Sequence, residues 1–365
     1  MSNKKRIVVA MSGGVDSTTV AALLKQEGHE VIGITMQLLD YKDAEGGCCS
    51  LDHVVDARRV AQELDIPHYV VNFMDSFKEL VLKDYVEKYE SGKTPIPCVL
   101  CNQFVKFDLL LKRALELGAD YLATGHYAKI ERVNGIYSLN KADDENKDQT
   151  YFLYTLKQKE LSRLMFPLGS LKKDDVRNMA RKLNLKLAEK PDSTGVCFVP
   201  SGNYRDYLIS QSEFTENEGD IVNTQGDVMG KHKGIFSFTV GQRRGLGIAA
   251  GKPMYVVEIK PSENRVVVGE EDKIYSNKLL AEKISWVEDL TANNSSTDNI
   301  AEKEFEVKAK VRYRHHEDDA LVTMKSDTDA VVEFKNPQRA ITPGQAVVFY
   351  KNKKVLGGGW INRVL

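Results

Sequence analysis

Hydrophobic and polar positions follow two different patterns along the chain, and the change comes near residue 210. Before it, four short apolar runs predict strands, at Ile7–Ala10, Val31–Thr35, His68–Val71 and Tyr121–Thr124. Apolar residues at helical spacing predict helices between and after them, at Asp16–Gln26, Val54–Leu64, Phe77–Tyr89, Val105–Leu117 and Tyr204–Ser210. Strands that alternate with helices predict an α/β domain with an open parallel sheet.

The second pattern is typical of β structure. From Glu218 onward, glycines at short intervals separate brief runs of β-type residues, which predicts a small β domain ending near Glu270. The polar stretch Thr291–Asn299 predicts a loop, and Phe305–Leu365 predicts a small barrel. We therefore expect three domains, at residues 1–210, 211–275 and 276–365.

The segment AMSGGVDS, Ala10–Ser17, joins the first predicted strand to the first predicted helix. Its adjacent glycines, Gly13 and Gly14, let the backbone turn sharply and approach a ligand closely. Free N–H groups at a helix start form an anion site, so the segment is expected to bind phosphate. A Walker loop would end in a lysine followed by Ser or Thr, and this segment contains no lysine. The alternative is a plain turn whose helix is capped by Asp16.

The composition is that of an ordinary soluble chain. Of its 365 residues 28% are charged, the formal net charge is -1 and the mean hydropathy is -0.36. No apolar stretch approaches the ~20 residues of a membrane-spanning helix, and the N-terminal MSNKKR lacks the apolar core of a signal peptide. We therefore expect a cytoplasmic protein without membrane attachment. Because the net charge is not positive, nucleic-acid binding would need local basic patches.

Five cysteines are candidates for chemistry. Cys98 and Cys101 form a C-x-x-C pair, Cys48 and Cys49 are adjacent, and Cys197 stands alone in KPDSTGVCFVP. An odd number of cysteines without a secretion signal favours metal-binding or reactive thiols over a disulfide framework. Zinc would prefer a second C-x-x-C pair or added histidines, so it is the weaker interpretation, and buried inert thiols are the other alternative. Cys101 is favoured as a reactive thiol because a helix is predicted directly after it, and a helix start lowers the pKa of a thiol.

Two further segments are candidates for contact with nucleic acid. EVKAKVRYRHH alternates without a break, which predicts a strand with four cations on one face: Lys308, Lys310, Arg312 and Arg314. Such a row suits a phosphate backbone, and a solvated outer face is the alternative. In NKDQTYFLY, a loop that contacts nucleic acid is expected at Lys147, Asp148 and Gln149, and the aromatic residues after it are expected in the core.

These segments together resemble the bacterial tRNA-specific 2-thiouridylases, which are ATP-dependent sulfurtransferases with a PP-loop. The resemblance covers essentially the whole chain. Its carriers are AMSGGVDS, GITMQL, PCVLCN, ATGHYA, KDQTYFL, PDSTGVCF, TVGQRRGLGI, VRYR, PGQAVVFY and LGGGWI. The resemblance implies a Rossmann-like PP-loop domain that binds ATP, a small central β domain and a barrel-like domain that binds tRNA.

The resemblance also implies the reaction. PP-loop enzymes break ATP between the α- and β-phosphates, so a Walker lysine is not required. The family adenylates O2 of the wobble uridine in certain tRNAs and then delivers sulfur from a cysteine persulfide. The products are 2-thiouridine, AMP and pyrophosphate, and Mg²⁺ accompanies the ATP. A sulfur-donor protein, either a cysteine desulfurase or a sulfur-relay protein, is the implied partner besides tRNA.

The family's functional residues can be carried onto this sequence. Cys197 would bear the persulfide, and Cys101 would release the sulfur or close a disulfide with Cys197. No resident metal is implied. The residues implied to bind ATP are Ala10, Met11, Ser12, Gly13, Gly14, Val15, Asp16, Ser17, Met36 and Gly125. The residues implied to contact tRNA, the first three of them at the target base, are Ile96, Pro97, Cys98, His126, Lys147, Asp148, Gln149, Arg312, Tyr313 and Gln345.

One motif departs from the family pattern. Two other functions are alternatives to that of a 2-thiouridylase. Many members have Asn-Pro-Asp where this chain has Ile96-Pro97-Cys98, so neither the amide nor the carboxylate is present here. One competing function is that of another PP-loop ligase or amidotransferase acting on a small molecule. That function would need neither the two β domains nor paired thiols. The other is that of a tRNA-binding or sulfur-carrier protein with an inactive nucleotide loop.

Overall fold

The computed structural model describes residues 4–41, 50–183, 185–191, 195–199, 204–211, 216–288 and 303–365. The chain forms two compact units. The first comprises residues 1–82, 98–204 and 353–355, and the second comprises residues 83–97, 205–352 and 356–365. Within the described ranges, no helix is both long enough and apolar enough to span a membrane.

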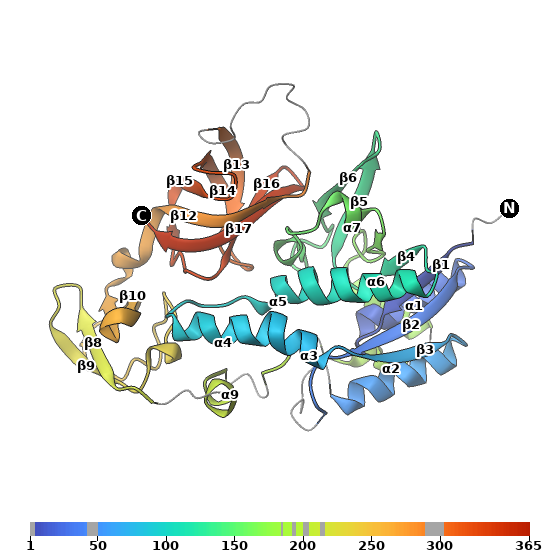
Figure 1. Ribbon diagram of the computed structural model, residues 1–365, viewed down its shortest axis with the longest axis horizontal. Coiled ribbons are helices and arrows are strands. Elements are labelled where there is room, and N and C mark those ends of the chain that lie inside the picture. The colour runs from blue at the N-terminus through green and yellow to red at the C-terminus, as the bar shows by residue number, and fades with distance from the viewer. Residues whose placement is uncertain are drawn as a thin grey trace. The chain divides into compact units, whose positions relative to one another are not determined.

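The first unit is built on a five-stranded parallel sheet with strand order β3-β2-β1-β4-β7 (Figure 1). Its strands are β1 (Arg6–Ala10), β2 (Glu30–Gln37), β3 (His68–Asn72), β4 (Tyr121–Ala123) and β7 (Leu164–Met165). Strand β1 is apolar because it lies in the middle of the sheet, where Ile7, Val8 and Val9 are fully buried. The strand order reverses beside β1. Ligands are therefore expected at the carboxyl ends of β1 and β4, as in other sheets of this kind. The predicted α/β class is confirmed.

Helices of three kinds complete this unit. The α-helices are α1 (Val15–Gln26), α2 (Leu51–Glu63), α3 (Met74–Phe77), α6 (Leu111–Glu116), α7 (Gln158–Leu161) and α8 (Lys173–Lys182). In the described part of this unit they are accompanied by two wide π-helical stretches, η1 (Lys78–Leu82) and η2 (Cys101–Leu110), and by two 3-10 turns, η3 (Thr150–Phe152) and η4 (Lys186–Glu189). Helix α1 packs against α8, and both bury small or branched side chains in one core.

Three helices lie at the boundaries between the two units in the sequence. They are α4 (Lys83–Glu90), α5 (Pro97–Leu100) and α9 (Tyr204–Gln211). Helix α5 runs directly into η2, so the helix expected from Val105 begins eight residues earlier, at Pro97. Proline is favoured in the first helical turn because its missing N–H would have no partner there. This corrects the prediction for Cys101, which is the fifth helical residue and not a residue before the helix.

A hairpin in the first unit was not expected from the sequence. Strands β5 (Ala128–Val133) and β6 (Ile136–Lys141) pair in antiparallel register across a two-residue turn. Asn134 and Gly135 both have positive φ angles, of 51° and 86°. This is the backbone of the tight turn that an Asn-Gly pair favours.

The second unit contains two β assemblies. A four-stranded sheet has the order β10-β11-β8-β9, formed by β8 (Gly219–Asn223), β9 (Val228–His232), β10 (Tyr255–Lys260) and β11 (Arg265–Gly269). 3-10 turns flank these strands, namely η6 (Ile235–Ser237), η7 (Pro261–Glu263) and η8 (Glu271–Ile274). The C-terminal strands form the order β12-β15-β14-β13-β16-β17, and β12 also pairs with β17, which closes a barrel. The predicted β-rich C-terminal part and its barrel are confirmed.

The barrel strands are long, and their inward residues fill a single core. They are β12 (Tyr275–Trp286), β13 (Glu304–Lys310), β14 (Asp318–Met324), β15 (Ala330–Arg339), β16 (Ala346–Lys351) and β17 (Lys354–Val364). Strand β13 alternates as predicted, with Val307 and Ala309 buried and Lys308 exposed. It ends at Lys310, however, and Arg312 and Arg314 lie in the turn that follows. The expected straight row of four cations is therefore wrong.

Gly13 makes the turn from β1 into α1 possible. Its φ is +69°, and a Cβ added there would lie 2.2 Å from the backbone oxygen of His53 in α2. Gly14 is a matched neighbour in ordinary extended backbone, with φ -102°. The nearest heavy atom to an added Cβ at Gly14 would be Ser12 Oγ, at 3.4 Å.

We predict that Gly13→Ala destabilises the first unit and Gly14→Ala does not. The left-handed backbone alone costs a residue with a side chain about 1–2 kcal/mol, and the clash with a backbone oxygen adds to it. Gly14→Ala should change the free energy of unfolding by less than about 1 kcal/mol. Thermal and urea unfolding of the two variants measure the difference. Equal losses of stability would contradict this account of the turn.

Candidate active site

The phosphate loop is held by its own side chains. The Ser12 N–H donates to Ser17 Oγ at 3.0 Å, and Ser17 Oγ donates to the Gly14 oxygen at 3.3 Å. Gly14 is the N-cap of α1 and brings no side chain to the helix start. The first N–H groups of an α-helix have no carbonyl partner within the helix. The loop therefore presents backbone donors where an anion is expected to bind.

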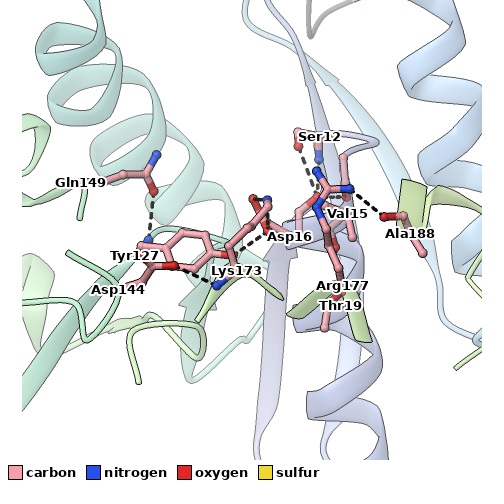
Figure 2. A network of polar contacts seen from close by, with 12 residues as sticks. Ser12, Val15, Asp16, Thr19, Tyr127, Asp144, Gln149, Lys173, Arg177 and Ala188 are labelled. Atoms are coloured by element: carbon pink, nitrogen blue, oxygen red, sulfur yellow. Dashed lines mark hydrogen bonds and ion pairs between the residues drawn. The ribbon is translucent and has the colours of Figure 1, made fainter. Parts of the chain in front are cut away.

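Asp16 lies at the centre of a polar network (Figure 2). Lys173 Nζ, from the first turn of α8, donates to both carboxylate oxygens of Asp16 at 2.7 Å. The Tyr127 hydroxyl donates to Asp16 Oδ1 at 2.9 Å, and the Lys173 N–H donates to Asp144 Oδ2 at 2.9 Å. Asp16 thus binds a lysine and a tyrosine and does not cap α1, which differs from the plain-turn alternative.

Two residues expected at the adenosine lie at the ends of β4 and β2, the two strands that flank β1. Gly125 follows β4, and an added Cβ there would lie 2.9 Å from the Ser17 nitrogen and 3.0 Å from Asp16 Cβ. The start of α1 therefore packs directly on Gly125, and this close approach requires a glycine. Met36 is the next-to-last residue of β2 and is partly exposed. Their role in binding adenosine stays a prediction.

Cys101 occupies the point at which the α-helical turn of α5 widens into the π-helix η2. It is buried, whereas Cys98 is half-buried. Asn102, also buried, donates from Nδ2 to the Phe152 oxygen at 3.1 Å, and its Oδ1 has no hydrogen-bond partner. Wide π-type turns within a helix occur often at functional sites. The free N–H groups of the helix start belong to the turn before Cys101, which weakens the helix-start argument for a low pKa of its thiol.

The segment that carries Cys197 is anchored in the first unit on both sides of this half-buried residue. Before it, Lys190 Nζ donates to the Gly13 oxygen at 3.1 Å and to Asp56 Oδ2 at 2.8 Å. After it, the buried Phe198 packs edge-to-face on Phe77, with ring centroids 5.5 Å apart. The lysine contact ties this segment to the phosphate loop itself. Cys48 and Cys49 lie outside the described residues.

The residues expected to contact tRNA in the first unit make internal contacts. Asp148 is buried and accepts from the Ala142 N–H at 3.1 Å and from Thr150 Oγ1 at 2.6 Å. Gln149 Oε1 accepts from the Tyr127 N–H at 2.9 Å, and Lys147 is partly exposed in the same loop. Of the aromatic residues after the loop, Tyr151 and Tyr154 are fully buried as predicted, whereas Phe152 is only half-buried.

His126 is another expected tRNA contact, and its side chain is buried. Nδ1 lies 2.7 Å from Thr124 Oγ1, and the ring packs between Phe107 and Phe166. Burial, with a smaller effect from Lys106, holds the pKa of His126 well below its usual value, so the ring is neutral at pH 7. A contact with tRNA stays a prediction for this residue.

In the second unit, Gln345 holds the segment that leads to Ile96 and Pro97. Its Nε2 donates to the Thr94 and Pro95 oxygens at 3.0 and 3.2 Å. Ile96 and Pro97 are themselves buried. Gln345 is therefore joined to Pro95, the residue directly before Ile96, although 250 positions separate the two in the sequence.

Arg312 and Tyr313 lie in the turn after β13. Arg312 Nη2 donates to the Val240 oxygen at 2.9 Å and to Thr342 Oγ1. Lys310 Nζ lies 5.7 Å from the ring centroid of Tyr313. The exposed Lys308 is paired with Asp319 of β14 at 2.9 Å, so a carboxylate neutralises part of the expected basic row.

Sequence reasoning missed Lys173, Tyr127 and Lys190. Lys173 lies 157 positions from Asp16, and no local pattern links the two.

The described part of the chain contains no group of three or more His, Cys, Asp or Glu side chains that could hold a metal ion.

Family models match three consecutive parts of the chain. The model described as the tRNA methyl transferase HUP domain matches residues 5–201. The tRNA methyl transferase PRC-barrel domain matches residues 207–270, and the aminomethyltransferase beta-barrel domain matches residues 276–361. These models describe the parallel sheet with its phosphate loop, the four-stranded sheet and the closed barrel.

Curated relatives match almost the whole chain. A protein of Geobacter metallireducens named tRNA-specific 2-thiouridylase MnmA is 49% identical over 99% of this chain and 98% of its own length. Proteins of the same name from Lachnoclostridium phytofermentans and Clostridium kluyveri are 47% and 45% identical, each over 98% of this chain and 99% of its own length. Similarity of this extent, together with the phosphate loop and the three matched domains, places the chain in the tRNA-specific 2-thiouridylase family.

Proposed function

We propose that this protein is an ATP-dependent sulfurtransferase that converts the wobble uridine of tRNA to 2-thiouridine. The observation that carries the proposal is the phosphate loop on which α1 begins, with uncapped backbone donors, in a chain that belongs to the 2-thiouridylase family. A PP-loop without a lysine suits the release of pyrophosphate. The presence of the two β assemblies favours a tRNA substrate over a small molecule.

The first half-reaction activates the uridine. The N–H groups at the start of α1 bind ATP phosphates, and Gly125 and Met36 line the adenosine. The uridine O2 forms a bond to the α-phosphorus, and the bond from that phosphorus to the bridging oxygen breaks, which releases pyrophosphate. The carboxylate of Asp16 and the hydroxyls of Ser12 and Ser17 suit Mg²⁺, which is held mainly by substrate phosphates and water in such sites. Mg²⁺ neutralises phosphate charge when bound.

The second half-reaction transfers sulfur. The outer sulfur of a persulfide on Cys197 attacks C2 of the activated uridine, and AMP leaves with its oxygen. The Cys101 thiolate then attacks the Cys197 sulfur, so a disulfide forms and the outer sulfur stays on C2. A thiol reductant restores both cysteines for the next turnover. The anchoring of the Cys197 segment to Gly13 through Lys190 supports a thiol that works beside the ATP site.

The remaining partners follow from this chemistry. We propose that tRNA is contacted through Ile96–Cys98, His126, Lys147–Gln149, Arg312, Tyr313 and Gln345. A sulfur-donor protein, a cysteine desulfurase or a sulfur-relay protein, loads Cys197. A tRNA substrate, and catalytic thiols that must be reduced after each turnover, favour the cytoplasm as the place where the protein works.

We predict that the protein splits ATP to AMP and pyrophosphate in a reaction that depends on tRNA. Chromatography of α-labelled ATP after incubation with tRNA and Mg²⁺ measures the product. Omission of tRNA is the control and should reduce AMP at least tenfold. ADP as the main nucleotide product, or AMP release that ignores tRNA, would contradict the proposed function.

We also predict that loss of Cys197 and loss of Cys101 block the reaction at different steps. Cys197→Ser should adenylate tRNA without thiolating it, because the atom that carries the sulfur is missing. Cys101→Ser should leave the outer sulfur bonded to Cys197, either as the persulfide or, after attack on activated tRNA, as a Cys197–S–S–C2 linkage, because no thiolate attacks the Cys197 sulfur. Nucleoside analysis of tRNA and assay of protein-bound persulfide report the two steps, with Cys48→Ser as the control that should retain activity. Near wild-type 2-thiouridine in either catalytic variant would refute these roles.

A further inference from the structure

The phosphate loop contains no cation, yet a lysine from another element touches it. Residues 10–17 include no lysine or arginine. Lys173 Nζ lies 2.7 Å from both carboxylate oxygens of Asp16, the second residue of α1 (Figure 2). A positive charge is thus held at the helix start, beside the backbone donors that bind an anion.

We propose that Lys173 supplies the cation that the loop lacks, binding the β- and γ-phosphates of ATP and then the pyrophosphate that leaves. This inference rests on the proposed function, because it assigns a residue to the departure of pyrophosphate. In the free protein the Asp16 carboxylate takes the place of the phosphate oxygens as the partner of Lys173.

The surroundings of Lys173 hold its amine in place. Its side chain is 9% exposed, whereas that of Asp16 is 30% exposed, so the pair is open to solvent mainly on the carboxylate side. The Lys173 N–H is fixed by Asp144, and Nζ lies 5.7 Å from the ring centroid of Tyr127. A buried ammonium needs an anion close by. The dianionic end of ATP meets that need better than one carboxylate.

Lys190 is the other lysine that reaches the loop, and its contacts suit a different role. It donates to the Gly13 oxygen and to the Asp56 carboxylate of α2. Through these two contacts Lys190 links the backbone of the loop to a carboxylate of α2. Lys173 instead contacts a side chain at the helix start, where phosphate oxygens are expected.

Negative charge develops on pyrophosphate as it leaves, and Lys173 is placed to offset that charge. As the uridine O2 bonds to the α-phosphorus, the electron pair of the breaking bond passes to the bridging oxygen of pyrophosphate. The Lys173 ammonium lies at that leaving group and offsets its added negative charge without giving up a proton. Interactions that strengthen as charge develops accelerate such a transfer.

Binding of inorganic pyrophosphate and of AMP, measured by calorimetry in EDTA, tests the proposal without turnover. Lys173→Met should weaken pyrophosphate binding about 10- to 100-fold, the range for losing a hydrogen bond to a charged group. It should leave AMP binding within about twofold. Lys172→Met, an exposed neighbour, is the matched control and should match wild type. Lys173→Arg keeps the charge and should retain most of the affinity, which covers the case in which Lys173→Met does not fold.

Asp16→Asn separates direct binding from a merely structural role. If Lys173 binds phosphate directly, Asp16→Asn should keep or strengthen pyrophosphate binding, because it removes the competing carboxylate. Equal losses in Asp16→Asn and Lys173→Met, with no further loss in the double variant, would show that Lys173 acts only through Asp16 and would overturn the proposal. Unchanged pyrophosphate binding in Lys173→Met, or loss of AMP binding alone, would overturn it too. The proposed function is tested separately. If the wild-type protein makes AMP only with tRNA, the proposed function stands even when the role of Lys173 is refuted. ADP as the product would refute the proposed function itself.

Discussion

The ion pair between Asp16 and Lys173 organises the first unit. Burying a lone charge costs several kcal/mol, so the two residues hold their helices together as a matched pair. Helix α1 continues from the phosphate loop, and the first turn of α8 also binds Asp144 through its backbone. The Tyr127 hydroxyl adds a third contact, and its backbone is bonded to Gln149. The phosphate loop and the loop at Gln149 are therefore parts of one hydrogen-bonded network.

The residues to which we assign roles divide between the two units. The first carries the phosphate loop, Cys101 and the Cys197 segment, and Lys190 joins that segment to the loop. The second carries Ile96, Pro97 and Gln345, and uses the amide of Gln345 to fix the backbone before Ile96. Substrate activation and sulfur chemistry are thus assigned to one unit, and several of the proposed tRNA contacts to the other.

Local patterns in the sequence predicted the parts of the fold that local forces determine. The strand, turn and helix around Gly13 were predictable because apolar runs and glycines act over a few residues. The partner of Asp16 was not, because it lies far along the chain. The start of the helix at Pro97 was not predicted, because Pro95 and Pro97 precede Cys98 and a proline lacks the N–H that a helix interior uses. The alternation through Arg314 predicted too long a strand, because the backbone turns after Lys310 while the residue pattern continues.

The closed barrel limits how this protein can meet other molecules. Because β12 pairs with β17, the ring leaves almost no row of free backbone N–H and C=O groups at an edge. A partner therefore has little backbone to extend and must be recognised mainly by side chains, on the outer faces of strands or in the turns between them. A substitution in those turns can therefore change which molecules bind the barrel without changing the residues of its buried core.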